Sequence, residues 1–417
     1  PQLLGYPFVT TVLHPGDSLT VRQRLVYILV LGALTALGPF TIDLYLPAFP
    51  IIEADLGVST AVIQLTLTAT TLGFALGQLL VGPWSDRVGR RMPLIIATTL
   101  HVFASLGVAI APSVELLMLF RVLQGVGTAA GAVVAMAIVR DLFGGLPLVR
   151  MLSRLSLVNG LAPILAPLIG SQLLLIMPWR GMFWILAAYG IVVLLAAIFF
   201  IVETLPPARR ADLGHSTTRQ RYRALLTDRV FVGVAIVGGM TFTGLFAYLS
   251  ASSFLFQGVY GLDPQQYGLV FAVNSIGIVS GVQASAYLAR FVGPQWILLG
   301  AVVALIAAAS TIVVLDANGA GLVGILVPLF FFITACGFTF PATQVLALAN
   351  HGGEAATAAS VLGALNFGLA GLISPIVGVF GIDNAIPMAS VMGCTAVVSL
   401  IVLVCVVRPR TVPALSR

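Results

Sequence analysis

The chain has 417 residues, of which 59% are hydrophobic and only 8% are charged, and its formal net charge is +6. A soluble domain carries about 25% charged residues, so this composition excludes a protein covered by water-exposed surface. Apolar runs of about 20 residues recur from end to end, without the in-and-out alternation of barrel strands. The composition therefore predicts an all-α polytopic membrane protein.

Twelve apolar segments are separated by charged or Gly-, Pro- and Asn-rich breaks. They cover residues 25–50, 60–83, 92–111, 114–139, 151–177, 181–203, 230–258, 266–289, 295–315, 321–349, 355–381 and 386–407. The longest break is rich in arginine and divides the segments six and six. We therefore expect an N-terminal six-helix bundle (1–203), a cytoplasmic central linker (204–229) and a pseudo-symmetric C-terminal six-helix bundle (230–417).

The basic residues indicate the orientation in the membrane. All 20 lysine and arginine positions are arginines, and apart from Arg121 and Arg180 they lie in the termini or in alternate loops. Because positively charged loops stay in the cytoplasm, both termini are expected there. No cleavable signal peptide is evident. The three cysteines fall within apolar runs without metal-ligand spacing, so we expect packing residues and no metal site.

The first segment carries an acid, Asp43, well inside the apolar run, next to Tyr45. A charge at the centre of a bilayer costs roughly 2.5–3.5 kcal/mol, so such a residue indicates function. Asp43 and Arg121 of the fourth segment each lie nine residues from the predicted outer end, about 14 Å deep at 1.5 Å per residue. Equal depth permits a proton-coupling pair. The alternative is that Asp43 only caps a break made by Pro47.

The loop between the second and third segments has the order G-x3-D-R-x-G-R-R. Its glycines permit a tight turn, and its acid can cap a helix or pair with an arginine to favour one packing of two helices. The alternative is a short inner loop that simply collects arginines. The residues of this conformational motif are Gly82, Asp86, Arg87, Gly89, Arg90 and Arg91.

The fourth segment contains Arg121, Gln124, Gly125 and Gly127, in the pattern R-x-x-Q-G-x-G. An arginine cannot lose its proton in a protein, so its charge must be balanced or solvated. Together with Gly131, the glycines provide a face for close helix approach. The alternative is a structural arginine that is held by backbone carbonyl groups.

The fifth segment has prolines four residues apart, which kink a helix and free carbonyl groups, among small residues that allow sliding contact. With Gly160, Pro163, Pro167 and Gly170, this stretch resembles the antiporter motif of exporters, in a form that departs from the usual G-P-x-x-G-G.

Several polar and aromatic residues lie at depth within the segments and could line a mostly uncharged pocket, although each alone is more often helix–helix packing. The histidines His101 and His351 have no partners in sequence and are expected to be incidental. The predicted substrate-binding residues are Tyr45, Gln64, Thr68, Asn159, Phe242, Phe246, Tyr248, Asn274, Phe338 and Asn366.

Together, residues 43–48, the loop 82–91, the fourth-segment pattern, Arg140-Asp141 and the stretch 203–210 resemble the Bcr/CflA subfamily of the major facilitator superfamily. The resemblance is densest over 33–210 and thin in the second half. It implies the major facilitator fold, alternating access and export of varied lipophilic drugs, of bicyclomycin or phenicol type, from bacteria in exchange for protons. It also implies location in the bacterial inner membrane.

The sequence contains no phosphate-binding loop and no lysine to complete one, so we expect an ion gradient to supply the energy and no cofactor to be needed. Asp43 is expected to take up a proton outside and to release it inside. The expected partners are the drug, protons and the lipid bilayer, with no nucleic acid, and the chain is expected to be a monomer. Alternatives are export of an endogenous metabolite such as an amino acid, or a facilitative carrier of the same fold. An enzyme is not expected, because the acids are scattered.

Overall fold

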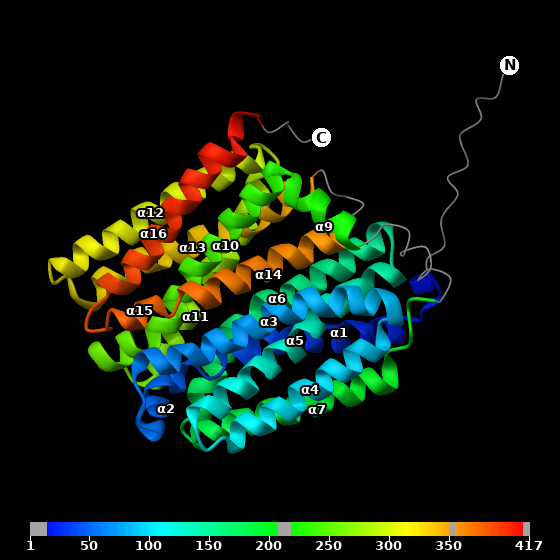
Figure 1. Ribbon diagram of the computed structural model, residues 1–417, viewed down its shortest axis with the longest axis horizontal. Helices are drawn as coiled ribbons and strands as arrows, with labels where there is room; N and C mark the ends of the chain where they lie inside the picture. Colours follow the sequence, from blue (N-terminus) through cyan, green and yellow to red (C-terminus); the bar gives the residue numbers. More distant parts are fainter. Residues whose placement is uncertain (1–14, 207–217, 350–354, 412–417) are drawn as a thin grey trace.

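The chain folds into an elongated bundle of long helices in the computed structural model, which describes residues 15–206, 218–349 and 355–411 (Figure 1). Within these residues, 12 helical segments are long and apolar enough to cross a membrane, which confirms the predicted fold class. The first six spans are built from α1 (Val21–Asp43) with α2 (Phe49–Leu56), α3 (Thr60–Val88), α4 (Arg91–Ile110), α5 (Val114–Leu142), α6 (Gly145–Leu173) and α7 (Trp179–Phe200). The last six are built from α10 (Arg229–Ser253), α11 (Pro264–Leu288), α12 (Pro294–Ala317), α13 (Gly321–Leu348), α14 (Ala355–Ile373) with α15 (Ile376–Val379), and α16 (Ile386–Val402).

Local sequence explains where many helices begin and end. Thr20 and Asp263 form capping boxes at the starts of α1 and α11, and Ser113 accepts a hydrogen bond from the backbone at the start of α5. Gly57 ends α2 with a φ of 62°, a conformation that suits glycine. Short π-helical turns, Phe254–Val259 and Leu403–Val407, extend α10 and α16.

The first span is broken in the middle. Helix α1 ends at Asp43, and a short 3-10 turn, Leu46–Ala48, leads into α2. Pro47 lies inside this turn, as expected of a residue that cannot donate to a continuing helix. The predicted segment 25–50 was therefore too short, because the span continues to Leu56 beyond the break.

Two other predicted boundaries differ from the structure. The fifth candidate span, Arg150–Leu173, starts where predicted but ends before the predicted residue 177, and its helix α6 begins earlier, at Gly145, after the extended Gly144. The linker contains a helix, α9 (Thr218–Thr227), which the arginine-rich sequence did not predict. Arg209 and Arg210 of the linker and His351 lie outside the described residues.

The two ends of the bundle are packed differently. One end carries α9 and the start of α1, and is called here the arginine-rich end; the opposite end carries α2 and α15 (Figure 1). Toward the arginine-rich end, one buried apolar cluster draws only on the first six spans and another only on α9 and the last six. The largest cluster combines residues of both groups, including Phe49 and Phe254. Among the described residues, the two groups of spans therefore share a buried apolar core only in this largest cluster.

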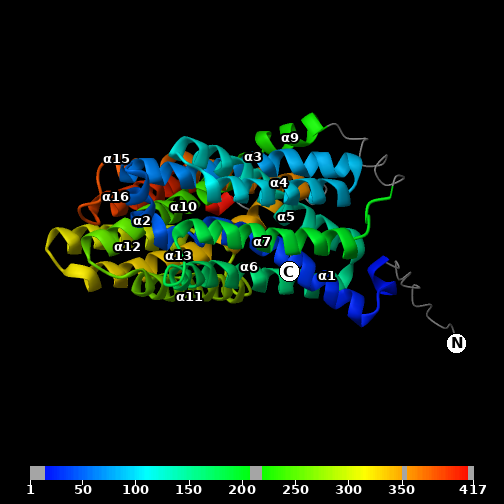
Figure 2. The ribbon, with the colours of Figure 1, turned by 90° about the horizontal axis from the view of Figure 1, so that it is seen from below.

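The two groups of spans also meet along two pairs of helices. Helix α3 packs against α14, and α6 packs against α11. Figure 2 shows α6 and α11 side by side. These two pairs form the most extensive helix contacts between the two groups of spans.

Candidate functional site

Arg121 lies on α5 and is completely buried (0% exposed). Its Nη1 donates to the backbone oxygen of Thr41 at 3.0 Å and to Oε1 of Gln124 at 2.7 Å. The guanidinium also lies 4.1 Å from the ring centroid of Tyr45 and 5.6 Å from that of Phe183. Because Thr41 belongs to the last turn of α1, the cation sits at the negative end of that helix and over two aromatic faces.

Gln124 extends this contact into a buried hydrogen-bonded chain. Its Nε2 donates to Oγ of Ser105 at 2.8 Å, and that hydroxyl lies 3.4 Å from Nε2 of His101. His101 is fully buried and belongs to the surroundings of Arg121. The expectation from the sequence that His101 is incidental was therefore wrong. The position of this histidine one helical turn before Ser105 is a signal that could have revealed this.

Asp43 is 6% exposed and is the last residue of α1. The ion pairs among the described residues join Arg90 to Asp86 and Asp141, and Arg180 to Asp55, so none involves this carboxylate. The expected ion pair with Arg121 is therefore not formed in this conformation. Nη1 of Arg121 is instead bonded to the Thr41 carbonyl group and the Gln124 amide, and the guanidinium lies over two aromatic rings, while its Nε and Nη2 have no hydrogen-bond partner among the described residues.

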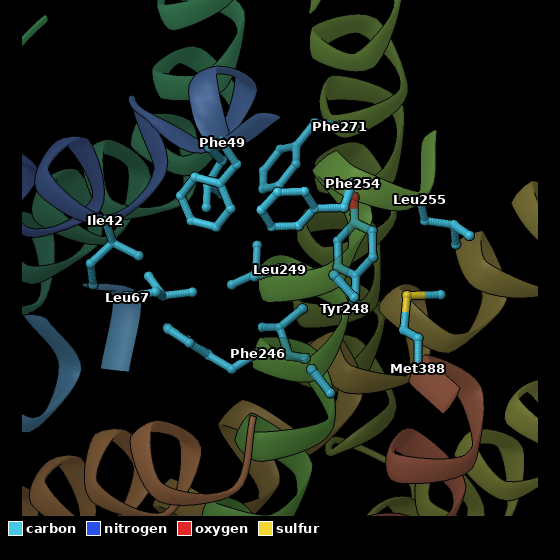
Figure 3. Packing of buried hydrophobic residues seen from close by; sticks show 14 of the residues in the cluster. Ile42, Phe49, Leu67, Phe246, Tyr248, Leu249, Phe254, Leu255, Phe271 and Met388 are labelled. Atoms are coloured by element: carbon cyan, nitrogen blue, oxygen red, sulfur yellow. The ribbon is translucent and has the colours of Figure 1, made fainter. Parts of the chain in front are cut away.

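The surroundings of the Asp43 carboxyl group come from both groups of spans. No described residue donates a hydrogen bond to it. The hydroxyl groups of Tyr248 on α10 and Tyr267 on α11 lie within electrostatic reach of it. These two tyrosines are themselves held by Asn274, at 3.1 Å from the Tyr248 oxygen, and by Ser252, at 3.0 Å from that of Tyr267. Figure 3 shows Tyr248 beside Phe254 and Phe271 in the shared core.

The glycines of the α5 motif lie where helices touch. A methyl group on Gly125 would overlap the backbone of α3 at Thr70, and one on Gly127 would overlap the backbone of α4 at Ala97. Gly131 lies in the same way against α1 at Leu34. The motif thus packs α5 closely against three helices, as its sequence predicted.

We expect Gly125→Ala to lower the free energy of unfolding by about 1–3 kcal/mol, because the added carbon must displace backbone atoms of α3. Gly300→Ala on α12 is the matched control, since a side chain there meets nothing within 4 Å. Thermal unfolding of both variants in the same detergent measures the difference. Equal midpoints for the two variants would contradict this close packing.

The conformational motif forms a buried polar network at the arginine-rich end. Gly89, with a φ of 105°, makes the turn from α3 to α4. Arg90 donates to Asp86 at 2.5 Å and to Asp141 of α5 at 2.9 Å. Burial alone would lower the pKa of the Arg90 guanidinium, but the hydrogen bonds and charges of these two carboxylates raise it above its usual value.

Glu203 completes this network from the end of the sixth span. Its carboxylate accepts from the backbone N–H groups of Arg90 at 2.9 Å and Arg91 at 3.3 Å, so it stabilises the start of α4. Thr204 also donates to Asp141 at 3.1 Å. Arg87 is exposed, whereas Gly82 approaches Ser360 of α14.

The predicted antiporter motif lies on α6, where this helix faces both α1 and α11. A side chain on Gly170 would overlap the backbone oxygen of Leu44, directly after Asp43. Gly160 faces Val279 of α11. Pro163 and Pro167 both lie inside the helix. The motif therefore borders the break in the first span and the contact with the second group of spans.

The predicted pocket residues fall into three groups. Tyr45 and Thr68 are buried within the first six spans, and Gln64 is buried between the two groups. Tyr248 and Asn274 are buried and hydrogen-bonded to each other. Asn159 is exposed, and Phe338 and Asn366 are partly buried.

Phe242 and Phe246 belong to a cluster of rings that the sequence revealed only in part. Phe242 lies 4.9 Å from Phe246 and 4.9 Å from Phe367, between ring centroids. Phe367 of α14 lies in turn 4.4 Å from Phe74 of α3, so the cluster crosses between the two groups of spans. Sequence reasoning missed Phe74 and Phe367, because only the packing of α3 on α14 brings them together.

Comparison with known proteins agrees with this architecture. The model of the Major Facilitator Superfamily matches residues 31–375. The uncharacterized MFS-type transporter YdgK of Bacillus subtilis is 36% identical over 385 residues, covering 91% of this chain and 94% of that one. The bicyclomycin resistance protein homolog of Haemophilus influenzae is 29% identical over 383 residues, covering 91% and 96%. The multidrug resistance protein MdtL of Escherichia coli is 28% identical over 385 residues, covering 92% and 96%.

Among solved structures, the xylose transporter XylE from E. coli, in a partially occluded inward-open conformation, superimposes with a TM-score of 0.73. The two chains are 14% identical, and the match covers 94% of this chain and 98% of XylE. At this identity the likeness shows the fold alone. With its 12 candidate spans and the family match over most of its length, the chain is a membrane transporter, not an enzyme, and belongs to the Major Facilitator Superfamily.

Proposed function

We propose that the chain is a proton-coupled antiporter of the Bcr/CflA type, which exports lipophilic drugs of bicyclomycin or phenicol type by alternating access. The observation that carries this proposal is the position of Asp43, buried without a partner among the described residues at the break of the first span. The names of the relatives from H. influenzae and E. coli support drug export.

The location of Asp43 suits a carboxyl group that binds and releases a proton. An ionised carboxylate is costly to bury unpaired, and the C-terminal end of a helix disfavours an anion further. The protonated acid therefore suits the present conformation, in which the opposite end of the bundle is closed. When the helices separate there, Asp43 would be open to the outside and would take up its proton. It would give up that proton on the cytoplasmic side, when the site faces the cytoplasm and the drug binds. Each cycle would carry one proton inward against one outward-moving drug.

The remaining motifs receive roles within this cycle. The network around Arg90 would hold the arginine-rich end of the first bundle (1–203) rigid, and the linker (204–229) would join it to the second bundle (230–417). The α6 motif would let α1 and α11 slide against it. The arginine distribution supports an orientation with the arginine-rich end and both termini in the cytoplasm of a bacterial cell and the opposite end outside.

The drug would bind between the two bundles, against the ring cluster that contains Phe242, Phe246 and Phe367. Aromatic faces bind varied lipophilic rings without strict geometry. Asn366 adds a polar group, since its buried Oδ1 has no hydrogen-bond partner in the described part of the chain. The absence of charge from this group of residues suits neutral drugs.

A susceptibility panel in an efflux-deficient bacterium tests the proposal. We expect expression of the chain to raise the tolerated concentration of some lipophilic drugs, and a protonophore to abolish that gain. Downhill exchange that ignores an imposed pH gradient would instead indicate a facilitative carrier. Export of amino acids with no change in any drug would indicate a metabolite exporter.

A further inference from the structure

Three glutamine side chains connect the two groups of spans near the opposite end of the bundle. Nε2 of Gln257, on the π-helical end of α10, donates to the backbone oxygen of Pro47 at 3.0 Å. Nε2 of Gln265, at the start of α11, donates to that of Ser171 at 2.8 Å. Each bond runs from the last six spans to the first six.

The third glutamine makes the connection in the other direction. Nε2 of Gln64 on α3 donates to the backbone oxygen of Ser250 on α10 at 3.1 Å. Gln64 is completely buried, and its Oε1 has no hydrogen-bond partner among the described residues and lies close to Gly378 of α15. All three amides thus donate to main-chain oxygens across the boundary.

The accepting carbonyl groups of Ser171 and Ser250 lie where helical hydrogen bonding is interrupted. The N–H of Leu175 donates to Gln172 instead of Ser171. Likewise the N–H of Phe254 donates to Ala251 instead of Ser250. The Ser171 carbonyl group thus lacks its usual helical donor Leu175 and the Ser250 carbonyl group lacks Phe254, so each can accept from a side chain.

Pro47 offers its carbonyl group for a related reason. It lies in the turn between α1 and α2, and the residue three positions on is Pro50, which has no N–H to donate. Asp43, the last residue of α1, lies four residues before Pro47. The Gln257 bond therefore joins the second group of spans to the break in the first span, just after the buried acid.

Aromatic packing lies beside these bonds. The rings of Phe49 and Phe254 lie 5.6 Å apart between centroids, and Figure 3 shows Phe49 from the first span facing Phe254 and Phe271 from the second group. The apolar contact supplies attraction without direction, whereas the three amides fix which carbonyl groups must meet.

We propose that Gln64, Gln257 and Gln265 form a glutamine clasp that closes the outer side of the transporter over Asp43. The clasp makes these three side chains positioning residues for alternating access. Their amides donate only when the two bundles meet at this end. When the bundles part, these hydrogen bonds break and water can reach the freed carbonyl groups. The inference rests on the proposed orientation and deepens the proposed function.

Distance measurements between spin labels test the clasp without drug or proton gradient. Labels at Ser59→Cys and Ala317→Cys, both exposed near the opposite end, report separation of the two groups of spans, in a background with Cys394→Ser and Cys405→Ser. We expect each of Gln64→Leu, Gln257→Leu and Gln265→Leu to shift the ratio of closed to separated forms about fivefold toward separation.

The isosteric changes Gln257→Glu and Gln265→Glu should act like the leucine variants, because a carboxylate keeps the shape but cannot donate. Gln266→Leu is the matched control, since Gln266 bonds only locally to Asp263 in the cap of α11. In transport assays the clasp variants should raise the KM for drug on the cytoplasmic side without lowering kcat, because fewer molecules are in the receptive state.

Each clasp position is tested singly, so one variant that fails to fold leaves the other two. Distance distributions unchanged in the folded variants would overturn the clasp, as would an equal shift in Gln266→Leu. Failure of the proposed function would give a different result. If the chain exports no drug but the clasp variants still shift the label distances as expected, the clasp stands and only the proposed drug export is refuted.

Discussion

Asp43→Asn is expected to abolish proton-driven drug export. The amide cannot gain or lose a proton, yet it fills nearly the same space as the protonated acid in its buried site. The folded state should therefore persist, and drug exchange down a gradient should remain. Purified chain in proteoliposomes with an imposed pH gradient measures both activities, and in the variant the gradient should no longer drive accumulation.

Asp383→Asn is the control for this experiment, because Asp383 is an exposed loop acid near the same end of the bundle. It should export drug as the unmodified chain does. Undiminished gradient-driven accumulation in Asp43→Asn would refute the role of Asp43 as the proton carrier.

The size of the expected loss follows from the energy that one proton supplies. Moving one charge across 100 mV provides about 2.3 kcal/mol, enough to sustain roughly a 50-fold gradient of a neutral drug. Without the proton, that gradient should fall to equality on both sides. The variant should therefore confer no resistance, even where it still binds the drug.

The spans and motifs were largely predictable from the sequence because each depends on local chemistry. Apolar length defined the twelve spans, and Pro47 marked the break in the first one. The glycines of α5 indicated close packing, because only glycine lets helix backbones approach so near. These features need no knowledge of which helices are neighbours.

What remained hidden depends on pairs of distant residues. Counting along the helices predicted the same depth in the membrane for Asp43 and Arg121. Equal depth does not determine the direction in which each side chain points. The guanidinium turned toward the Thr41 carbonyl group and the Tyr45 ring. The contact between Phe74 and Phe367 was hidden for the same reason, since it arises only where α3 meets α14.

Arg121→Leu is expected to reduce export about tenfold or more and to destabilise the fold. The substitution leaves the Thr41 carbonyl group and the Gln124 amide without their donor in a buried site. Each lost hydrogen bond from a charged group costs about 1.5–3 kcal/mol. Because Thr41 lies two residues before Asp43, the loss also loosens the turn that positions the acid.

Arg121→Lys separates a coupling role from a purely structural one. Lysine keeps the positive charge, but its single ammonium group cannot stack on Tyr45 as a planar guanidinium does while also bonding Thr41 and Gln124. If geometry at the break matters, the lysine variant should bind drug and yet export it poorly per folded molecule. A lysine variant with full export and an unchanged unfolding midpoint would show that charge alone suffices at this position. Loss of export only in proportion to loss of folded protein would instead assign Arg121 to the scaffold, as a side chain that fastens α5 to the end of α1.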